Sequence, residues 1–265
     1  MEQFETLLDE WRANPVMFAK DVLNVELDPL QQEILMALPD NDRLAVRSGN
    51  GPGKTFLSSI AALWFFCCFY QSAVITTAPT WPQVELLLWK EIRDNISRSD
   101  LLKPAIELAP RDCAAYMIQD GGVTSPKWMM VGRSTNKKEN MQGFHNPYLM
   151  FIVDEGSGVD DEIYEAIQGS QTQEGVQASK LLVIGNPTKP EGYFYDIFHK
   201  RSAGWKTFHL NSEDSPRVSK KWVQQMKDEY GEDSNFYQVH VLGNFPKYGE
   251  DTLIPLHWIE KAVMI

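Results

Sequence analysis

The chain has 265 residues, which is enough for one large domain, or for one domain with a smaller appendage. Hydrophobic residues make up 43% of the sequence and charged residues 23%, proportions that allow a globular protein with a sizeable core. The formal net charge of −11 argues against a protein that coats nucleic acid through its overall charge, but leaves room for a local basic patch.

We expect neither disulfides nor a membrane span. The three cysteines include an adjacent pair in an apolar run and lack the spacing of disulfide frameworks or zinc sites, which indicates a reducing compartment. The first residues, MEQFETLLDEW, are acidic and lack the basic start and apolar stretch of a signal peptide. The most apolar segment, residues 60–70, is shorter than the ~20 residues of a membrane-spanning helix and is predicted to be a buried helix.

The predicted elements alternate between helices and strands. In chain order they are amphipathic helices over 4–23, a helix opening at 28–33, a strand at 44–46, a glycine-rich loop at 48–53, an apolar helix over 55–70, a strand at 72–77, a helix over 82–95, strands at 127–132 and 148–153, a helix over 161–168 and a strand at 180–184. This order predicts an α/β fold with a mainly parallel sheet flanked by helices.

A change of texture near residue 190 predicts a second, smaller unit. Aromatic and charged residues and the turn-forming stretch NSEDSP dominate residues 190–250. We therefore expect a core with N-terminal helices over residues 1–190, and a small C-terminal subdomain and linker over residues 191–265.

A glycine-rich loop between a predicted strand and a predicted helix is the strongest functional motif. Its residues are Ser48, Gly49, Asn50, Gly51, Pro52, Gly53, Lys54 and Thr55. Glycines let backbone N–H groups converge on a phosphate, and a helix that begins near Lys54 directs its positive end at the same anion. Lys54 would reach the β- and γ-phosphates of ATP, and the Thr55 hydroxyl would bind Mg²⁺. Ser48 stands where the usual loop has glycine, and the alternative interpretation is a glycine-rich turn with an incidental lysine.

Two carboxylates end the most apolar predicted strand. Asp154 and Glu155 follow the run FIV, about 100 residues after Lys54. Ligands of parallel sheets bind at the carboxyl ends of the strands. Asp154 suits a contact to Mg²⁺, because hard cations prefer carboxylate oxygen, and Glu155 suits the activation of an attacking water. The alternative is an acidic cap of the next helix.

A polar turn, Gly185-Asn186-Pro187, ends the next predicted strand. Asn186 could sense the γ-phosphate or its attacking water and link hydrolysis to movement. Simple turn chemistry explains the same residues equally well, since Asn-Pro commonly starts a turn.

Further motifs lie in a fixed order along the chain. They are Leu27–Gln31, the loop Arg47–Thr55, Val74–Thr80, Gln142–His145 before the acidic pair, Gly185–Pro187 and Val241–Pro246. As an ordered set over about residues 20–260, they resemble the N-terminal ATPase domain of viral terminase large subunits, which occur in bacteriophages and prophages.

The resemblance implies a P-loop ATPase fold of the additional-strand, catalytic-glutamate type. It implies that Gln31 reads the base edge of ATP and that Asn186 belongs to a coupling motif. It also implies a motor that assembles as a homo-oligomeric ring on a portal protein, works with a small terminase subunit, and drives double-stranded DNA into a capsid. Such a motor acts in the host cytoplasm and transiently at the procapsid. A nuclease domain would begin where this chain stops, so we do not expect the chain to cut DNA.

Motors of this kind need a cation on the developing γ-phosphate charge, often from a neighbouring subunit. Arg133, between a predicted strand and a polar loop, is a candidate for that trans role, and Arg47 for a role in cis. A surface ion pair is the alternative for each arginine, and the family pattern does not fix Arg133.

Two other functions share parts of this pattern. A superfamily-2-like helicase or translocase has a glutamine motif, a P-loop and an acidic pair, but also a second similar α/β domain, for which this chain has no room. A non-catalytic scaffold that assembles on binding nucleotide would not need the complete set of Lys54, Thr55, Asp154 and Glu155.

Overall fold

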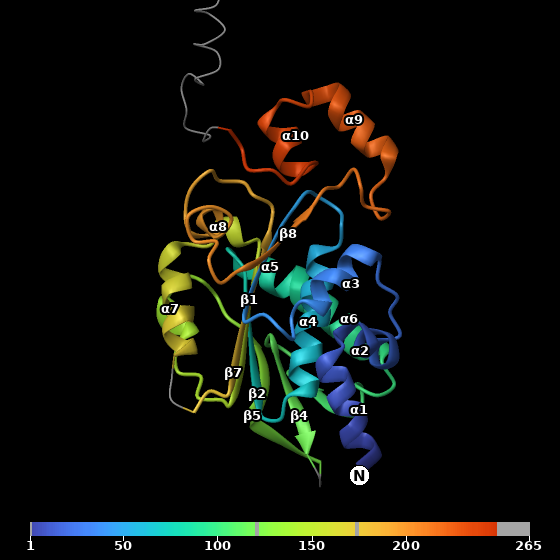
Figure 1. Ribbon diagram of the computed structural model, residues 1–265. Coiled ribbons are helices and arrows are strands. Elements are labelled where there is room, and N and C mark those ends of the chain that lie inside the picture. Colours follow the sequence, from blue (N-terminus) through green and yellow to red (C-terminus); the bar gives the residue numbers. More distant parts are fainter. Residues whose placement is uncertain (1, 120–121, 173–174, 248–265) are drawn as a thin grey trace, which may run out of the picture.

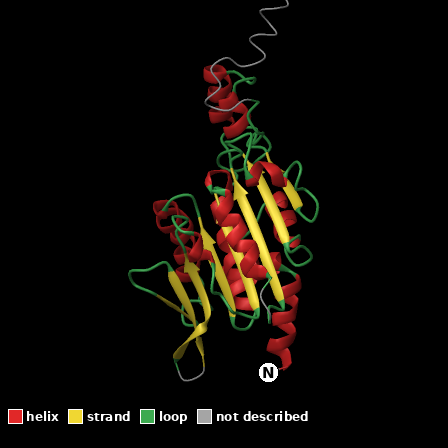
Figure 2. Ribbon diagram, turned by 90° about the vertical axis from the view of Figure 1, so that its left-hand side faces the viewer, coloured by secondary structure: helices red, strands yellow, loops and turns green. Residues whose placement is uncertain are grey.

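One eight-stranded sheet runs through the protein, and helices cover both of its faces (Figures 1 and 2). The computed structural model describes residues 2–119, 122–172 and 175–247. The strands are β1 (Arg43–Ser48), β2 (Ser72–Thr77), β3 (Ile106–Leu108), β4 (Ala114–Gln119), β5 (Val123–Gly132), β6 (Tyr148–Asp154), β7 (Ala178–Gly185) and β8 (Lys206–Leu210). They lie in the order β3-β4-β5-β2-β6-β7-β1-β8.

The strand order confirms the predicted fold class. The six strands from β5 to β8 in this order pair in parallel, and only β3, β4 and β5 pair antiparallel at one end. Strand β1 leads into the glycine-rich loop and β6 ends in the acidic pair. Strand β7 lies between them, which is the additional strand that the sequence-based fold class requires.

Helices cover the two faces unequally. The helices are α1 (Glu2–Ala13), α2 (Pro15–Leu23), α3 (Pro29–Met36), α4 (Lys54–Cys68), α5 (Trp81–Gln83), the π-helical η1 (Val84–Leu88), α6 (Trp89–Arg98), the short η2 (Lys138–Met141) and η3 (Gly156–Gly158), α7 (Asp161–Gln171), α8 (Tyr193–Ile197), α9 (Lys220–Tyr230) and α10 (Asn235–His240). The first four helices and α6 pack on one face, and α7 and α8 pack on the other.

Burial on both faces explains the continuous apolar runs of the central strands. On β6, Met150 and Ile152 belong to the core under α4, whereas Phe151 and Val153 belong to the core under α7. Successive side chains of a strand point to opposite faces, so a strand that is covered twice needs apolar residues throughout. Helix α4 is central to this arrangement, with Trp64 and Phe65 fully buried.

The region beyond residue 190 contributes to the main sheet. Strand β8 lies at the edge of the sheet and pairs in parallel with β1, while α9 and α10 stand apart from the sheet beyond its carboxyl ends (Figure 1). A division into a core and a smaller C-terminal unit stays a proposal, and β8 argues for a boundary after Leu210 instead of after residue 190. The part of the predicted linker beyond residue 247 lies outside the described residues.

Across the described ranges, none of the helices has the length and apolar character that crossing a membrane requires.

Candidate functional site

The glycine-rich loop connects β1 to α4 as the sequence predicts. Gly51 and Gly53 both adopt a φ of 90°, a left-handed conformation that favours glycine. Gly53 is the N-cap of α4 and provides no side-chain cap, so the first N–H groups of this helix face the loop without such a partner. The loop therefore lies at the positive end of a buried helix, which is the chemistry of a phosphate site.

A polar network joins the loop to the ends of the neighbouring strands. Lys54 Nζ donates hydrogen bonds to Asn186 Oδ1 (2.9 Å) and Gly49 O (3.1 Å), and it lies 3.9 Å from Glu155 Oε1. Asn186 Nδ2 donates to Ser48 O at 2.7 Å, and the Asn186 backbone N–H donates to Glu155 Oε2 at 3.3 Å. Asn186 thus contacts the loop, its lysine and the acidic pair at once.

The side chains of Thr55 and Asp154 form the second contact between loop and acidic pair. The Thr55 hydroxyl hydrogen-bonds the Asp154 carboxyl, which is only 3% exposed. Burial and, to a lesser extent, the nearby charge of Glu155 raise the pKa of Asp154 to about 7, against the opposing effect of Lys54. A divalent cation at this position would relieve both unfavourable effects.

The side chains of Thr55 and Asp154 fit a Mg²⁺ ion that is also bound by the phosphates of a nucleotide. A hydroxyl and a carboxylate are the oxygen donors that this hard cation prefers, and it usually takes its remaining ligands from phosphates and water. Within the described ranges, no group of three or more His, Cys, Asp or Glu side chains could hold a metal without such help.

The backbone of Glu155 is unusual. Glu155 has a φ of 50°, which is rare for a residue with a side chain. The turn passes so close to β7 that a Cβ atom on Gly185 would lie 3.0 Å from Glu155 Cα and 2.7 Å from Gly156 N. The Gly156 carbonyl is also held by the Tyr164 hydroxyl at 2.7 Å. This close packing fixes the Glu155 carboxylate beside Lys54 at the end of the strand.

Gln31 lies on the other side of the loop. Its side chain is 1% exposed and donates from Nε2 to Pro52 O at 3.1 Å. Asp28 caps α3 by accepting the Gln31 N–H at 3.0 Å, and Gln31 Oε1 accepts the Asp28 N–H at 3.4 Å. A cavity of about 300 Å³ opens beside these residues, between α3 and the segment after β8.

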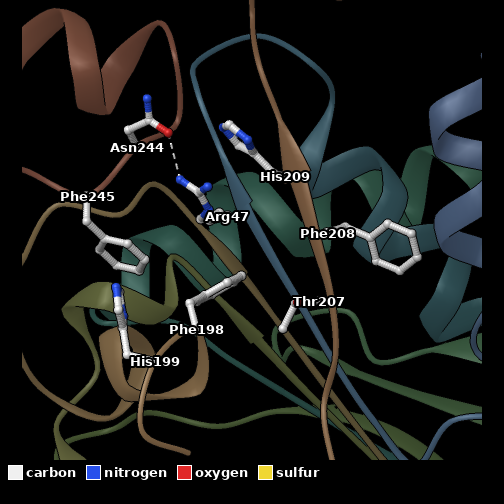
Figure 3. Close-up of a pocket in the computed structure, with 8 residues that line it drawn as sticks. All are labelled: Arg47, Phe198, His199, Thr207, Phe208, His209, Asn244 and Phe245. Carbon is white, nitrogen blue, oxygen red and sulfur yellow. Dashed lines mark hydrogen bonds between the residues drawn. The ribbon is translucent and has the colours of Figure 1, made fainter. Parts of the chain in front are cut away.

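Neither predicted arginine joins the network. Arg47 turns to the segment after α10, where its Nη1 donates to Asn244 Oδ1 (Figure 3) and to Gly243 O, both at 2.8 Å. It lines a cavity of about 420 Å³, and burial lowers the pKa of its guanidinium. The Arg133 guanidinium lies 5.9 Å from the Phe144 ring centroid. In the described part of the chain, no hydrogen bond or ion pair joins either guanidinium to Lys54 or Glu155.

The structure adds contacts that sequence reasoning missed. The first half of the loop is bonded to later parts of the chain, because Gly49 N–H donates to Leu210 O at the end of β8 (2.9 Å) and Asn50 N–H donates to His240 O at the end of α10 (2.7 Å). The Ser212 hydroxyl donates to Asn50 O at 2.7 Å. The only sequence signal for these partners is the turn-forming character of the segment that contains Ser212, and it does not reveal what the segment contacts.

The sheet order, the loop and the acidic pair define a P-loop protein of the additional-strand type. A family model described as "Terminase large subunit, T4likevirus-type, N-terminal" matches residues 47–261. The chain therefore belongs to the terminase large subunit family, and the resemblance found in its motifs is confirmed.

Individual relatives agree with this assignment. The chain is 30% identical over 260 residues to the "Probable terminase, large subunit" of Enterobacteria phage P7, a match that covers 92% of this chain and 51% of that protein. The chain thus spans about half the length of this curated relative.

Solved structures show the same fold. The large terminase ATPase domain of Thermus phage P74-26 superposes with a TM-score of 0.71 at 17% identity, covering 88% of this chain and 99% of that one. The large terminase of bacteriophage HK97 gives a TM-score of 0.68 at 14% identity, covering 88% of this chain and 55% of that one. A large terminase from a thermophilic bacteriophage, solved in complex with ADP, gives 0.64 at 16% identity, covering 83% and 54%.

Proposed function

We propose that this chain hydrolyses ATP with Mg²⁺ and couples the reaction to movement of double-stranded DNA into a viral capsid. The observation that carries the proposal is the contact of one side chain, Asn186, with both the phosphate loop and the acidic pair. A turn in this position can respond to a γ-phosphate and to the group that activates water.

The loop side of the site would hold the triphosphate. Backbone N–H groups at the start of α4 and the Lys54 ammonium would bind the β- and γ-phosphates. Thr55 and Asp154 would hold Mg²⁺, which supplies positive charge to the phosphate oxygens when bound. Gln31, at the rim of the cavity beside α3, would recognise the base.

Glu155 would position a water molecule in line with the γ-phosphate and take its proton as the new P–O bond forms and ADP leaves. In the structure its carboxylate lies near Lys54 and accepts the Asn186 N–H. Binding of a triphosphate would draw Lys54 to the phosphates, and Asn186 would lose one partner. This exchange would report the presence of the γ-phosphate to the turn after β7.

The two arginines would act in different places. Arg133 follows β5, which β2, β6 and β7 separate from the strand that leads into the phosphate loop, so we assign it to the loop of a neighbouring subunit. Arg47 could stabilise transition-state charge in cis only after leaving Gly243 and Asn244. Its present partners fit equally well with a role in holding the C-terminal segment.

The family supports the wider assignment. We propose that the motor works as a homo-oligomeric ring on the portal protein, together with a small terminase subunit, in the host cytoplasm and at the procapsid. We also propose that this chain powers DNA movement and does not itself cut DNA.

The test is steady-state ATP hydrolysis at several protein concentrations, with Glu155→Ala measured alongside. We expect Glu155→Ala to bind ATP within a few-fold of the parent affinity but to lose at least about a hundredfold in kcat, because the water loses its general base. Specific activity of the parent should rise with concentration if a neighbour supplies a cation. Hydrolysis by Glu155→Ala at the parent rate would contradict the role of Glu155.

A further inference from the structure

The segment between β8 and α9 reaches across the phosphate loop to the cap of α3. Arg217 Nε donates to Asp28 Oδ2 at 3.0 Å, and the Asp28 side chain is only 13% exposed. The other oxygen of the same carboxylate caps α3 by accepting the Gln31 N–H. One carboxylate therefore orients both the helix that carries Gln31 and an arginine from the C-terminal part of the chain.

The body of Arg217 also lies against the phosphate loop. A Cβ atom on Gly53 would lie 3.7 Å from Arg217 Cδ, and the guanidinium carbon is 5.5 Å from the ring centroid of Phe56, in the first turn of α4. The next residue, Val218, approaches the loop too, since its Cγ2 atom would lie 3.0 Å from a Cβ atom on Gly51. Arg217 thus spans from the cap of α3 to the start of α4.

Arg217 comes directly after Pro216, which lines the cavity beside Gln31. The cavity is lined by Pro29 and Leu30 of α3, by Pro52 of the phosphate loop, and by residues of the segment 210–216, namely Leu210, Asn211, Asp214, Ser215 and Pro216. The cavity, of about 300 Å³, is at the small end of the range for ligand sites and opens beside the phosphate loop. A base attached to a triphosphate in that loop would be received here.

We propose that Arg217 is the positioning residue of this base site. Its pair with Asp28 holds the wall 210–216 at the distance from α3 that a purine base needs, so base binding depends on the C-terminal part of the chain. The inference rests on the proposed nucleotide-binding function. It predicts that loss of Arg217 weakens binding of the base and leaves binding of the phosphates unchanged.

The experiment compares ATP with inorganic tripolyphosphate, which carries three phosphates but lacks both the ribose and the base. Binding is measured by competition against a fluorescent ATP analogue. We expect Arg217→Ala to raise the Kd for ATP about tenfold, as for loss of a charged hydrogen bond, and the Kd for tripolyphosphate by less than about twofold. The KM for ATP should rise in parallel while kcat at saturating ATP stays within about twofold.

Two further variants separate positioning from general damage. Arg217→Lys keeps the charge opposite Asp28 but not the planar group over Phe56, so its Kd for ATP should lie between those of the parent and Arg217→Ala. Asp28→Asn keeps a good helix cap and weakens the ion pair. It should raise the Kd for ATP, and combining it with Arg217→Ala should add little. Arg98→Ala, which removes an exposed arginine that pairs with Asp94, is the matched control and should change neither Kd.

Each outcome decides the matter. Unchanged ATP binding by Arg217→Ala, or an equal loss for ATP and tripolyphosphate, would overturn the proposal while leaving the nucleotide site in place. A Lys54→Ala variant should bind both ATP and tripolyphosphate more weakly, because it removes the phosphate contact itself. If the parent protein bound neither ligand, the proposed function would fail before any question about Arg217 arose.

Discussion

At the scale of single residues, Asn186 shows why the site acts as a unit. Its amide accepts from Lys54 and donates to Ser48, and its backbone donates to Glu155. The sequence alone left it undecided between a sensor and an ordinary Asn-Pro turn. Only the strand order, which places β7 between the loop strand and the acidic strand, shows that this turn lies between the two halves of the site.

Protonation of Asp154 should make the stability of the folded chain depend on pH. Its pKa is raised from 3.8 to about 7, mainly by burial, so the folded protein holds a proton that the unfolded chain has lost between these pH values. Without nucleotide and Mg²⁺, stability should therefore fall as pH rises from about 4 to about 7. The loss should be at most about 4 kcal/mol, since a tenfold change in proton affinity corresponds to about 1.4 kcal/mol.

Denaturant titrations at several pH values, on the parent and on Asp154→Asn, measure this effect. The amide does not titrate, so the difference in the free energy of unfolding between the two proteins should change across this pH range in favour of Asp154→Asn as pH rises. A constant difference would show that the Asp154 carboxyl titrates alike in the folded and unfolded chain.

At the scale of elements, the sequence predicts those whose signal is local. Strand β6 is a continuous apolar run, β2 is rich in β-branched residues, and β7 contains the apolar run LLVI. The loop before α4 follows from its glycines. Strands β3, β4 and β8 escaped prediction: β3 and β8 are short and form the two edges of the sheet, and β4 lies next to the edge strand β3. The predicted helix over residues 82–95 extends from Trp81 to Arg98 and contains the π-helical η1, which no pattern of apolar residues indicates. The contacts of Arg47 with Gly243 and Asn244 could not be predicted, because these residues are almost 200 positions away in the sequence and are brought close only by the tertiary fold.

The close contact between the phosphate loop and the C-terminal unit should make a side chain at residue 49 destabilising. A Cβ atom on Gly49 would lie 2.3 Å from both Val241 O and Ser212 Oγ, and the Val241 carbonyl belongs to the backbone. Gly49→Ala should therefore lower the free energy of unfolding by about 2–3 kcal/mol, as overpacking does. Gly169→Ala is the control, because nothing lies within 4 Å of its added Cβ inside α7, and it should stabilise by up to about 1 kcal/mol.

Chemical denaturation of the two alanine variants and the parent makes the comparison. Equal denaturation midpoints for Gly49→Ala and the parent would mean that the loop and the C-terminal unit separate without cost. In that case the hydrogen bond from Asn50 N–H to His240 O would not couple the phosphate loop firmly to the C-terminal unit.

At the scale of the whole molecule, net charge opposes the substrate that we propose. The chain carries a net charge of −11, and several of its basic groups have partners: Lys200 and Arg201 both pair with Asp196, and Lys227 pairs with Glu232. Affinity for duplex DNA depends on cations that replace the counterions of phosphates. Because 36 acidic residues outnumber 25 Lys and Arg residues in one copy, we expect tight binding to come from several copies that face the same DNA.

We therefore expect the monomer to bind a short DNA duplex with a Kd of roughly 10⁻⁵ M or weaker at physiological salt, the range of non-specific binding. Fluorescence anisotropy at dilute protein, repeated at two salt concentrations, measures this. Affinity should increase steeply once protein concentration allows assembly, in the same range where specific ATPase activity rises. Tight, salt-sensitive binding by the monomer would instead mean that one copy carries a complete basic surface for DNA. The ring would then be needed to move the DNA but not to bind it.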